Sequence, residues 1–201
     1  MWTRQAAAAG VAWTAVDTRR VQGMSAPEWS TDLAAHCGGG RSPAAVERAV
    51  VDAMVDALRT GLMEPFPGAA DMVRETAERV PVALATSAPR RLVDAVLDRH
   101  GLAPAFGATV SSAEVARGKP DPAVYREAAR RLDVDPRACV GVEDSSNGLR
   151  AAHAAGMTVL ALPNPTYPPE PDALALAARV ADGVPAARRA LDALLTATEV
   201  A

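Results

Sequence analysis

The chain is almost without lysine. Of its 21 basic side chains, 20 are arginine, and Lys119 is the single lysine. Lysine carries a compact point charge on a flexible stem, whereas the arginine guanidinium is a planar fork, so a site that places one positive charge among several oxygens can require lysine. Lys119 is therefore either a remnant of composition or a residue that a site needs, and its neighbours decide between the two.

Aromatic residues and net positive charge are also scarce. Aromatics make up 3% of the sequence, the formal net charge is −3 and the pI is about 5.6. No basic stretch is interleaved with aromatic residues, and no apolar run approaches the roughly 20 residues of a membrane span. We therefore expect neither nucleic acid nor a membrane as a partner.

Cysteine and histidine are too few and too scattered to build a metal centre. Cys37 and Cys139 lack metal-type spacing, and His36, His100 and His153 form no pair four residues apart. Both cysteines are typical of reduced thiols inside the cell. The N-terminal residues begin an amphipathic helix rather than a signal peptide, so we expect a soluble, cytoplasmic protein. We also expect it to be a monomer.

Residues 1–64 carry helix signals and no strand signal. The clearest helix begins with Ser42 as N-cap and Pro43 in the first turn, and it stops at Gly61. Its apolar residues recur at helical spacing. Shorter helices are predicted over Trp2–Ala9, Ala15–Val21 and Ala26–His36. The pattern predicts a small helical domain, a cap, over residues 1–64.

Pro65-Phe66-Pro67-Gly68 marks a boundary, and residues 65–201 alternate strands with helices. Alternation of this kind is typical of a parallel sheet covered by helices on both faces, so the predicted fold class is α/β. Strands are predicted over Val80–Ala85, Thr109-Val110, Ala138–Val142 and Met157–Leu162. Helices are predicted over Arg90–Arg99, after Asp121 as cap with Pro122 at the first position, over Ser146–Ala155 and over Ala186–Leu195.

Three polar clusters fall at the carboxyl ends of these strands, where parallel sheets bind ligands. Thr86-Ser87 follows one strand, Glu143-Asp144-Ser145 follows another, and Lys119 lies in a Gly/Pro loop before a helix. Hydroxyl donors, a mobile cation and paired carboxylates suit a phosphate with a divalent cation, because Mg²⁺ is typically held by one or two carboxylates plus phosphate oxygens and waters.

Each cluster also has a plain structural explanation. Thr86 and Ser87 can cap the helix that follows them. Glu143 and Asp144 can form an exposed turn that favours the helix dipole. The three clusters have no common function only if both of these explanations are correct and Lys119 is also a remnant of composition.

The same clusters resemble the motifs of the haloacid dehalogenase superfamily of phosphatases and phosphomutases, in particular its β-phosphoglucomutase-like branch. Val82–Ser87 is similar to the second motif of that family, Arg117–Pro122 to the third and Val140–Gly148 to the fourth. Ala151–Met157 continues the family pattern. The resemblance covers nearly the whole chain and implies a Rossmann-like parallel sheet with helices on both faces plus a helical cap.

The resemblance also implies roles for particular residues. Thr86, Ser87 and Lys119 would bind the transferring phosphoryl group, with Thr86 and Lys119 as catalytic residues. Glu143 and Asp144 would hold Mg²⁺. We therefore expect a Mg²⁺-dependent phosphatase that acts on a small phosphorylated metabolite through an aspartyl-phosphate intermediate.

One motif of the family is missing, the Asp-x-Asp that follows a central strand and supplies the nucleophile. The only Asp-x-Asp, Asp133-Val134-Asp135, is followed by Pro136 and has the context of a helix-stop turn. We therefore expect an N-terminally truncated or mis-assigned chain that is inactive as given. Without the central strand, the edges of Val80–Ala85 and Ala138–Val142 would stay unpaired, at roughly 1–3 kcal/mol for each buried group.

The cap loop Gly23-Met24-Ser25 resembles the substrate-specificity loop of the family, so these residues are predicted to bind substrate. Phosphosugar mutases of the branch carry an arginine after the serine, where this chain has Ala26. This difference favours a phosphatase over a β-phosphoglucomutase-like mutase. The residues also leave open a haloacid dehalogenase, suggested by Ser145-Ser146-Asn147, and a non-catalytic binding protein.

Overall fold

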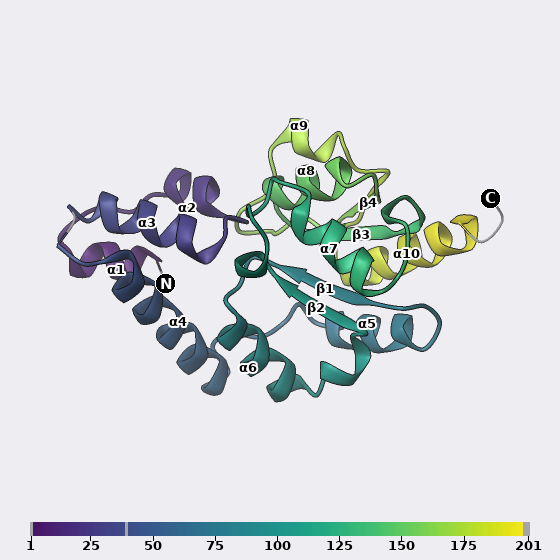
Figure 1. Ribbon diagram of the computed structural model, residues 1–201, viewed down its shortest axis with the longest axis horizontal. Coiled ribbons are helices and arrows are strands. Elements are labelled where there is room, and N and C mark those ends of the chain that lie inside the picture. Colours follow the sequence, from purple (N-terminus) through teal and green to yellow (C-terminus); the bar gives the residue numbers. More distant parts are fainter. Residues whose placement is uncertain (1, 39, 199–201) are drawn as a thin grey trace.

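The computed structural model describes residues 2–38 and 40–198, and its four N-terminal helices lie together at one end of the molecule (Figure 1). Two of the predicted helices have the observed bounds, and the other two differ by one or two residues at an end. The helices are α1 (Trp2–Ala8), α2 (Ala15–Val21), α3 (Ala26–His36) and α4 (Pro43–Arg59). The division into two domains at residue 64 stays a prediction.

The helical module has its own apolar core. The rings of Trp13 and Trp29 each lie near that of Trp2, with centroids 6.4 and 6.1 Å away, and Leu33 and Val50 are fully buried beside them. Aromatic pairs at such distances add to the free energy of area burial. All three tryptophans of the sequence thus lie in this small module, where large side chains supply much buried area.

The described residues after the cap form five short strands, and all of their pairs are parallel, as predicted. β1 pairs with β2, and a separate sheet has the order β3-β4-β5. The strands are β1 (Ala83–Thr86), β2 (Ala108–Ser111), β3 (Val140–Glu143), β4 (Thr158–Ala161) and β5 (Arg179–Val180).

Helices cover both faces of the strands, which confirms the α/β class. Val159 and Ala161 of β4 pack among residues of α7, α8 and α9, whereas Leu160 between them packs against α5 and α10. Alternate residues of one strand thus enter two different apolar layers, as expected for a sheet buried on both sides. The helices are α5 (Ala69–Ala77), α6 (Arg90–His100), α7 (Ala123–Arg131), α8 (Ser146–Ala154), α9 (Pro171–Leu174) and α10 (Val184–Thr198).

A break separates the two sheets between β1 and β3. The ladder bonds place the backbone groups of Val140 and Val142 on the side of β3 away from β4, and those of Ala83 and Ala85 on the side of β1 away from β2. No described strand pairs with either edge. Val142 is 36% exposed although it is apolar. The unpaired inward edges are those that the sequence predicted.

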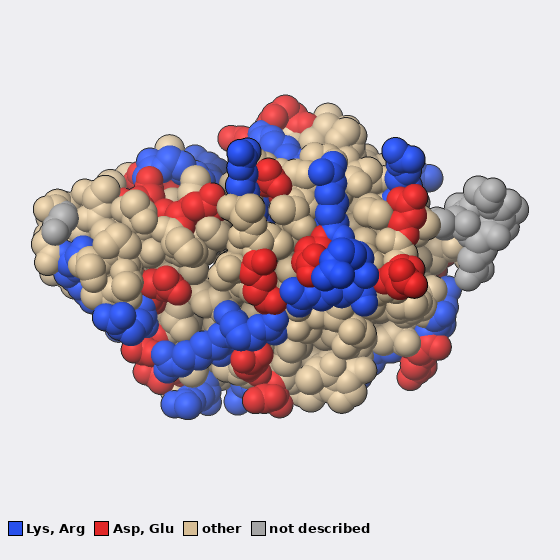
Figure 2. Space-filling model, viewed as in Figure 1, with Lys and Arg blue, Asp and Glu red and all other residues tan. Residues whose placement is uncertain are grey.

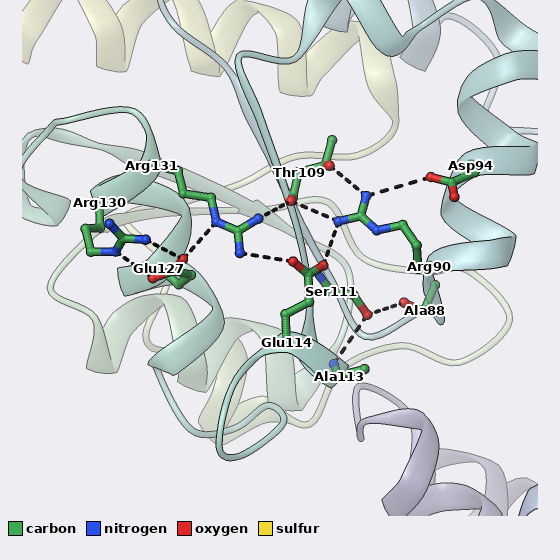
Figure 3. A network of polar contacts seen from close by, with 10 residues as sticks. All are labelled: Ala88, Arg90, Asp94, Thr109, Ser111, Ala113, Glu114, Glu127, Arg130 and Arg131. Atoms are coloured by element: carbon green, nitrogen blue, oxygen red, sulfur yellow. Dashed lines mark hydrogen bonds and ion pairs between the residues drawn. The ribbon is translucent and has the colours of Figure 1, made fainter.

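The opposite edge of β2 is covered by arginine side chains from two helices (Figure 3). Arg90 of α6 and Arg131 of α7 both donate to the Thr109 carbonyl oxygen, over 3.2 and 2.9 Å. Both arginines also bind Glu114, at 2.6 and 3.0 Å. Charged side chains on a sheet edge prevent further strand pairing there.

The single Asp-x-Asp of the sequence lies in a turn after α7, as predicted. Asp133 has a left-handed φ of 57°, directly after the C-cap Leu132. Asp135 caps the next 3₁₀ turn by accepting from the Arg137 amide at 2.8 Å. Neither carboxylate is placed at the end of a strand. Across the described residues, no helix combines the length and apolar character needed to cross a membrane.

Candidate active site

Lys119 is buried between the carboxyl ends of β1 and β3. The residue is 6% exposed, and its ammonium donates to the Ala85 carbonyl oxygen at 3.1 Å, to the Tyr125 hydroxyl at 3.3 Å and to Glu143 Oε1. An ammonium has three donors, and the protein uses all of them. One side chain thus joins the ends of two strands that share no ladder.

Tyr125 completes this arrangement from α7. Its hydroxyl donates to Glu143 Oε1, and its ring lies 4.8 Å from the Lys119 ammonium. Burial, and then the neighbouring Glu143 carboxylate, raise the pKa of Tyr125 well above its usual value, so the phenol stays a neutral donor. The sequence analysis missed this polar role of Tyr125.

The Glu143 carboxylate is fully engaged by the protein. Its Oε1 binds Lys119 and Tyr125, while its Oε2 accepts from the Asp144 amide at 3.2 Å and the Ser145 hydroxyl at 3.4 Å. A Cβ added to Gly148 would come within 1.9 Å of Oε2. Only glycine leaves room for this carboxylate against α8.

Asp144 differs from Glu143 in having unused acceptor capacity. Asn164 donates to its Oδ2 at 3.4 Å, and no described side chain donates to Oδ1. Burial and the nearby Glu143 raise the pKa of Asp144 above its usual value. Within the described residues, no three His, Cys, Asp or Glu side chains gather as metal ligands. The chemistry of Asp144 fits an ion such as Mg²⁺, which needs only one or two protein carboxylates.

Thr86 and Ser87 lie at the end of β1, as predicted. Thr86 Oγ1 accepts from the Ala88 amide at 3.1 Å in the turn before α6, which leaves its own O–H free to donate. The N-cap of α6 is Pro89, and no side chain bonds to the start of this helix, so the capping explanation for Thr86 and Ser87 is wrong. Ser87 donates to the Gly23 carbonyl oxygen at 2.5 Å. The Ser87 hydroxyl thus connects the core to the cap in this structure.

The cap loop around Gly23 lies directly on the core. Gly23 has a φ of +85°, and a Cβ there would approach the Asn147 Cβ to 2.9 Å. Asn147 donates to the Gln22 carbonyl oxygen at 2.8 Å. A Cβ on Gly118, beside Lys119, would come within 2.7 Å of the Ser25 amide nitrogen. The structure therefore brings the predicted loop within contact distance of the Lys119 loop.

The members of this loop point in different directions. Met24 packs against the apolar core of the cap. Ser25 caps α3 and donates its hydroxyl to Glu28 at 2.5 Å. The backbone of the loop, rather than the Met24 side chain, therefore faces the candidate site.

Comparison with known proteins gives consistent results along most of the chain. The model of the haloacid dehalogenase-like hydrolase family matches residues 1–156. A bifunctional riboflavin kinase/FMN phosphatase from Arabidopsis thaliana is 39% identical over 104 residues, which cover 51% of this chain and 27% of that protein. Hexitol phosphatase B from Escherichia coli is 38% identical over 90 residues, 45% of this chain and 40% of the relative.

Protein CbbY from Rhodobacter capsulatus is 34% identical over 134 residues, which cover 63% of this chain and 59% of the relative. The chain thus matches less than two thirds of the length of each of these three relatives.

Solved structures share the fold. CbbY from Rhodobacter sphaeroides in complex with phosphate superposes with a TM-score of 0.75 at 28% identity, covering 90% of this chain and 84% of the other. A β-phosphoglucomutase from Clostridium difficile has a TM-score of 0.78 at 19% identity, covering 100% and 90% of the two chains. The sequence motifs, the parallel α/β core and the family match agree, and the chain belongs to the haloacid dehalogenase-like hydrolases.

Proposed function

We propose that this chain carries the phosphate-binding part of a Mg²⁺-dependent phosphatase for a small phosphorylated metabolite. The observation that carries the proposal is the position of the Lys119 ammonium, which contacts Ala85 of β1 and Glu143 of β3 where both strands end. Parallel sheets bind ligands at that edge. The FMN and hexitol phosphatases among the relatives, and the CbbY structure with phosphate, support the same class of substrate.

Two groups of the site would bind phosphoryl oxygens. The free O–H of Thr86 can donate to one oxygen. A second oxygen would replace Ala85 or Tyr125 as an acceptor of Lys119, because both of these bonds are longer than 3 Å. Glu143 and Tyr125 would hold the ammonium in place during this exchange. A preorganised cation in a buried site stabilises negative charge far more than one in water.

The magnesium ion would be held mainly by Asp144. Glu143 could reach the ion only by giving up one of its protein donors, whereas Asp144 has a free oxygen. The remaining ligand positions would be filled by phosphate oxygens and waters. When bound, the ion offsets the negative charge of the phosphoryl group.

The nucleophile that the family resemblance implies has no counterpart among the 201 residues. The single Asp-x-Asp lies in the turn after α7, away from Lys119. We therefore expect the chain as given to bind phosphate and to leave an aryl phosphate intact. Turnover of the aryl phosphate that depends on Lys119 would contradict this expectation.

The competing functions differ in their chemistry. A mutase of the branch would need a cation at Ala26, but this side chain is buried in the cap core, where an arginine does not fit. A dehalogenase would bind its ligand equally well with and without EDTA. The proposed phosphatase site loses affinity for phosphate when Mg²⁺ is removed.

Titration calorimetry with inorganic phosphate and Mg²⁺ tests the proposal. Thr86→Val preserves the shape of the side chain and Lys119→Arg preserves its charge, and each should weaken binding about tenfold or more, the loss expected for a hydrogen bond to a charged group. Arg117→Gln is the matched control, because Arg117 lies two residues from Lys119 with its side chain 79% exposed. Equal affinities for all four proteins would overturn the assignment.

A further inference from the structure

A second polar cavity lies between the cap and the core, apart from the candidate active site. Its volume is about 510 Å³. One wall comes from α2, with Arg19 and Arg20, and the other from α8, with Ser146 and Arg150. None of the residues predicted to bind phosphate or metal lines it. Small-molecule sites typically occupy roughly 300–1,000 Å³, so the cavity has the size of a metabolite site.

Two of its arginines are held in fixed positions. Arg20 donates to Asp17 at 3.0 Å and to Asp32 at 2.8 Å. Arg150 donates through one nitrogen, Nη2, to Glu170 and Asp172, both at 2.6 Å. A guanidinium has five N–H groups, so each arginine keeps donors that these contacts do not use.

Arg19 is the third arginine, and it differs from the other two. It has no hydrogen-bond or ion-pair partner among the described residues, and it is exposed. Figure 2 shows basic side chains gathered over α2 on this face. The positive charges of Arg20 and Arg150 are offset by the four carboxylates that they bind, so the cavity as a whole is not strongly basic. It offers directed N–H groups and one uncompensated cation, which suits a single oxyanion group on a small molecule.

The rest of the lining suits the body of such a molecule. Val16, which is 61% exposed, and Pro168 supply apolar surface, and Gln22 and Asn147 supply amides. These two amide residues are also the ones joined by the 2.8 Å bond between cap and core. Gln22 precedes Gly23, the residue that Ser87 binds. A ligand in the cavity would therefore sit beside the contacts that hold the cap loop on the core.

We propose that this cavity is a second binding site, for a small polar organic anion carrying a phosphate or carboxylate group, and that its occupant holds the cap against the core. Arg19 and the unused donors of Arg150 bind the oxyanion. The site goes beyond the proposed phosphatase activity and does not depend on it, because none of the residues proposed to bind phosphate or metal lines the cavity.

Chemical-shift mapping by ¹H–¹⁵N NMR on the whole chain tests the proposal, with glucose 6-phosphate and gluconate as probes. A second site predicts shifts at Arg19, Ser146 and Arg150 with a dissociation constant of their own. Arg19→Gln should raise this constant about tenfold, the loss of one charge-assisted hydrogen bond, and leave shifts at Thr86 and Lys119 unchanged. Arg4→Gln, an exposed arginine of α1, is the control and should change neither set.

The remaining outcomes are also decisive. Shifts with glucose 6-phosphate alone identify the ligand as a phosphate ester, and shifts with both probes identify a general oxyanion site. Absence of shifts at the cavity residues would overturn the proposal. So would cavity shifts that follow the same binding curve as Lys119, or that Arg19→Gln leaves unchanged. Loss of binding at Lys119 with an intact cavity response would instead contradict the proposed function alone.

Discussion

The side chains of Lys119 and Glu143 form an ion pair in which each is 6% exposed. Removing two charges from water costs several kcal/mol for each ion, and the attraction between them offsets this cost only when further hydrogen bonds satisfy both groups. Here Tyr125, Ala85 and the Asp144 amide supply those bonds. The protein should therefore lose less free energy of unfolding when both side chains are replaced than when only one is.

We expect Lys119→Met to lower the free energy of unfolding by about 3–5 kcal/mol, because it leaves the Glu143 charge buried without its partner. The double variant Lys119→Met/Glu143→Gln should recover a large part of this loss. Urea denaturation of four proteins, the wild type, the two single variants and the double variant, measures both effects. Additive losses in the double variant would show that the two side chains are not coupled.

The Tyr125 hydroxyl should matter for the position of the lysine. Tyr125→Phe removes one donor to Glu143 and one acceptor of Lys119, at a cost of about 1–3 kcal/mol. Because Lys119 is the only lysine, ¹⁵N-lysine labelling gives a single side-chain ammonium signal, and that signal should move in the variant. Tyr167→Phe, at the only other tyrosine, should leave it in place. An unmoved signal in Tyr125→Phe would rule out the contact.

The break between β1 and β3 should be visible in hydrogen exchange. The amides of Ala85 and Val142 face the break, whereas those of Leu84 and Gly141 face a neighbouring strand. The first two should exchange roughly tenfold faster or more, since a difference of about 1.4 kcal/mol in protection is a factor of ten. Equal protection within each strand would mean that the break is closed in solution.

Acid should weaken the arginine network of Figure 3. Hydrogen bonds from Arg130 and then Arg131 lower the pKa of Glu127 from 4.5 to about 2. A depressed pKa in the folded state contributes stability above the unfolded value, and this contribution is lost as the pH falls from about 4.5 towards 2. The difference in melting temperature between wild type and Glu127→Gln should therefore be constant above about pH 5 and shrink below about pH 4. A difference in melting temperature that does not change with pH would contradict the ion pairs of Glu127 with Arg130 and Arg131.

The sequence predicted best those elements whose ends are set by local chemistry. The helices Ala15–Val21 and Ala26–His36 have the predicted bounds because Thr14 and Ser25 form capping boxes at their starts. Three of the four predicted strands, those from Val80, Ala138 and Met157, were predicted to begin too early. Ala138 belongs to a 3₁₀ turn that Asp135 caps, so β3 begins only at Val140. Helix α5 was missed although it is amphipathic, because it begins after Gly68 without a side-chain cap to mark its start.

The sequence predicted which candidate site residues lie at one edge of the strands but not the contacts between them, and their roles stay a prediction. Thr86, Lys119, Glu143 and Asp144 meet at one edge because parallel strands end together. The pairing of Glu143 with Lys119 also involves Tyr125, which lies on a different element, α7. Nothing in the residues next to Tyr125 indicates this contact. Asn164 and Asn147 were missed for the same reason, since their partners Asp144 and Gln22 lie 20 and 125 residues away.

The burial of the lone lysine has a practical consequence. Its ammonium is the only side-chain amine in the sequence, and it is enclosed by Ala85, Tyr125 and Glu143. Amine-directed reagents such as acyl esters therefore have no side-chain target while the strand ends stay together. The rate at which Lys119 becomes acylated would report, at a single position, how often the break between the two sheets opens.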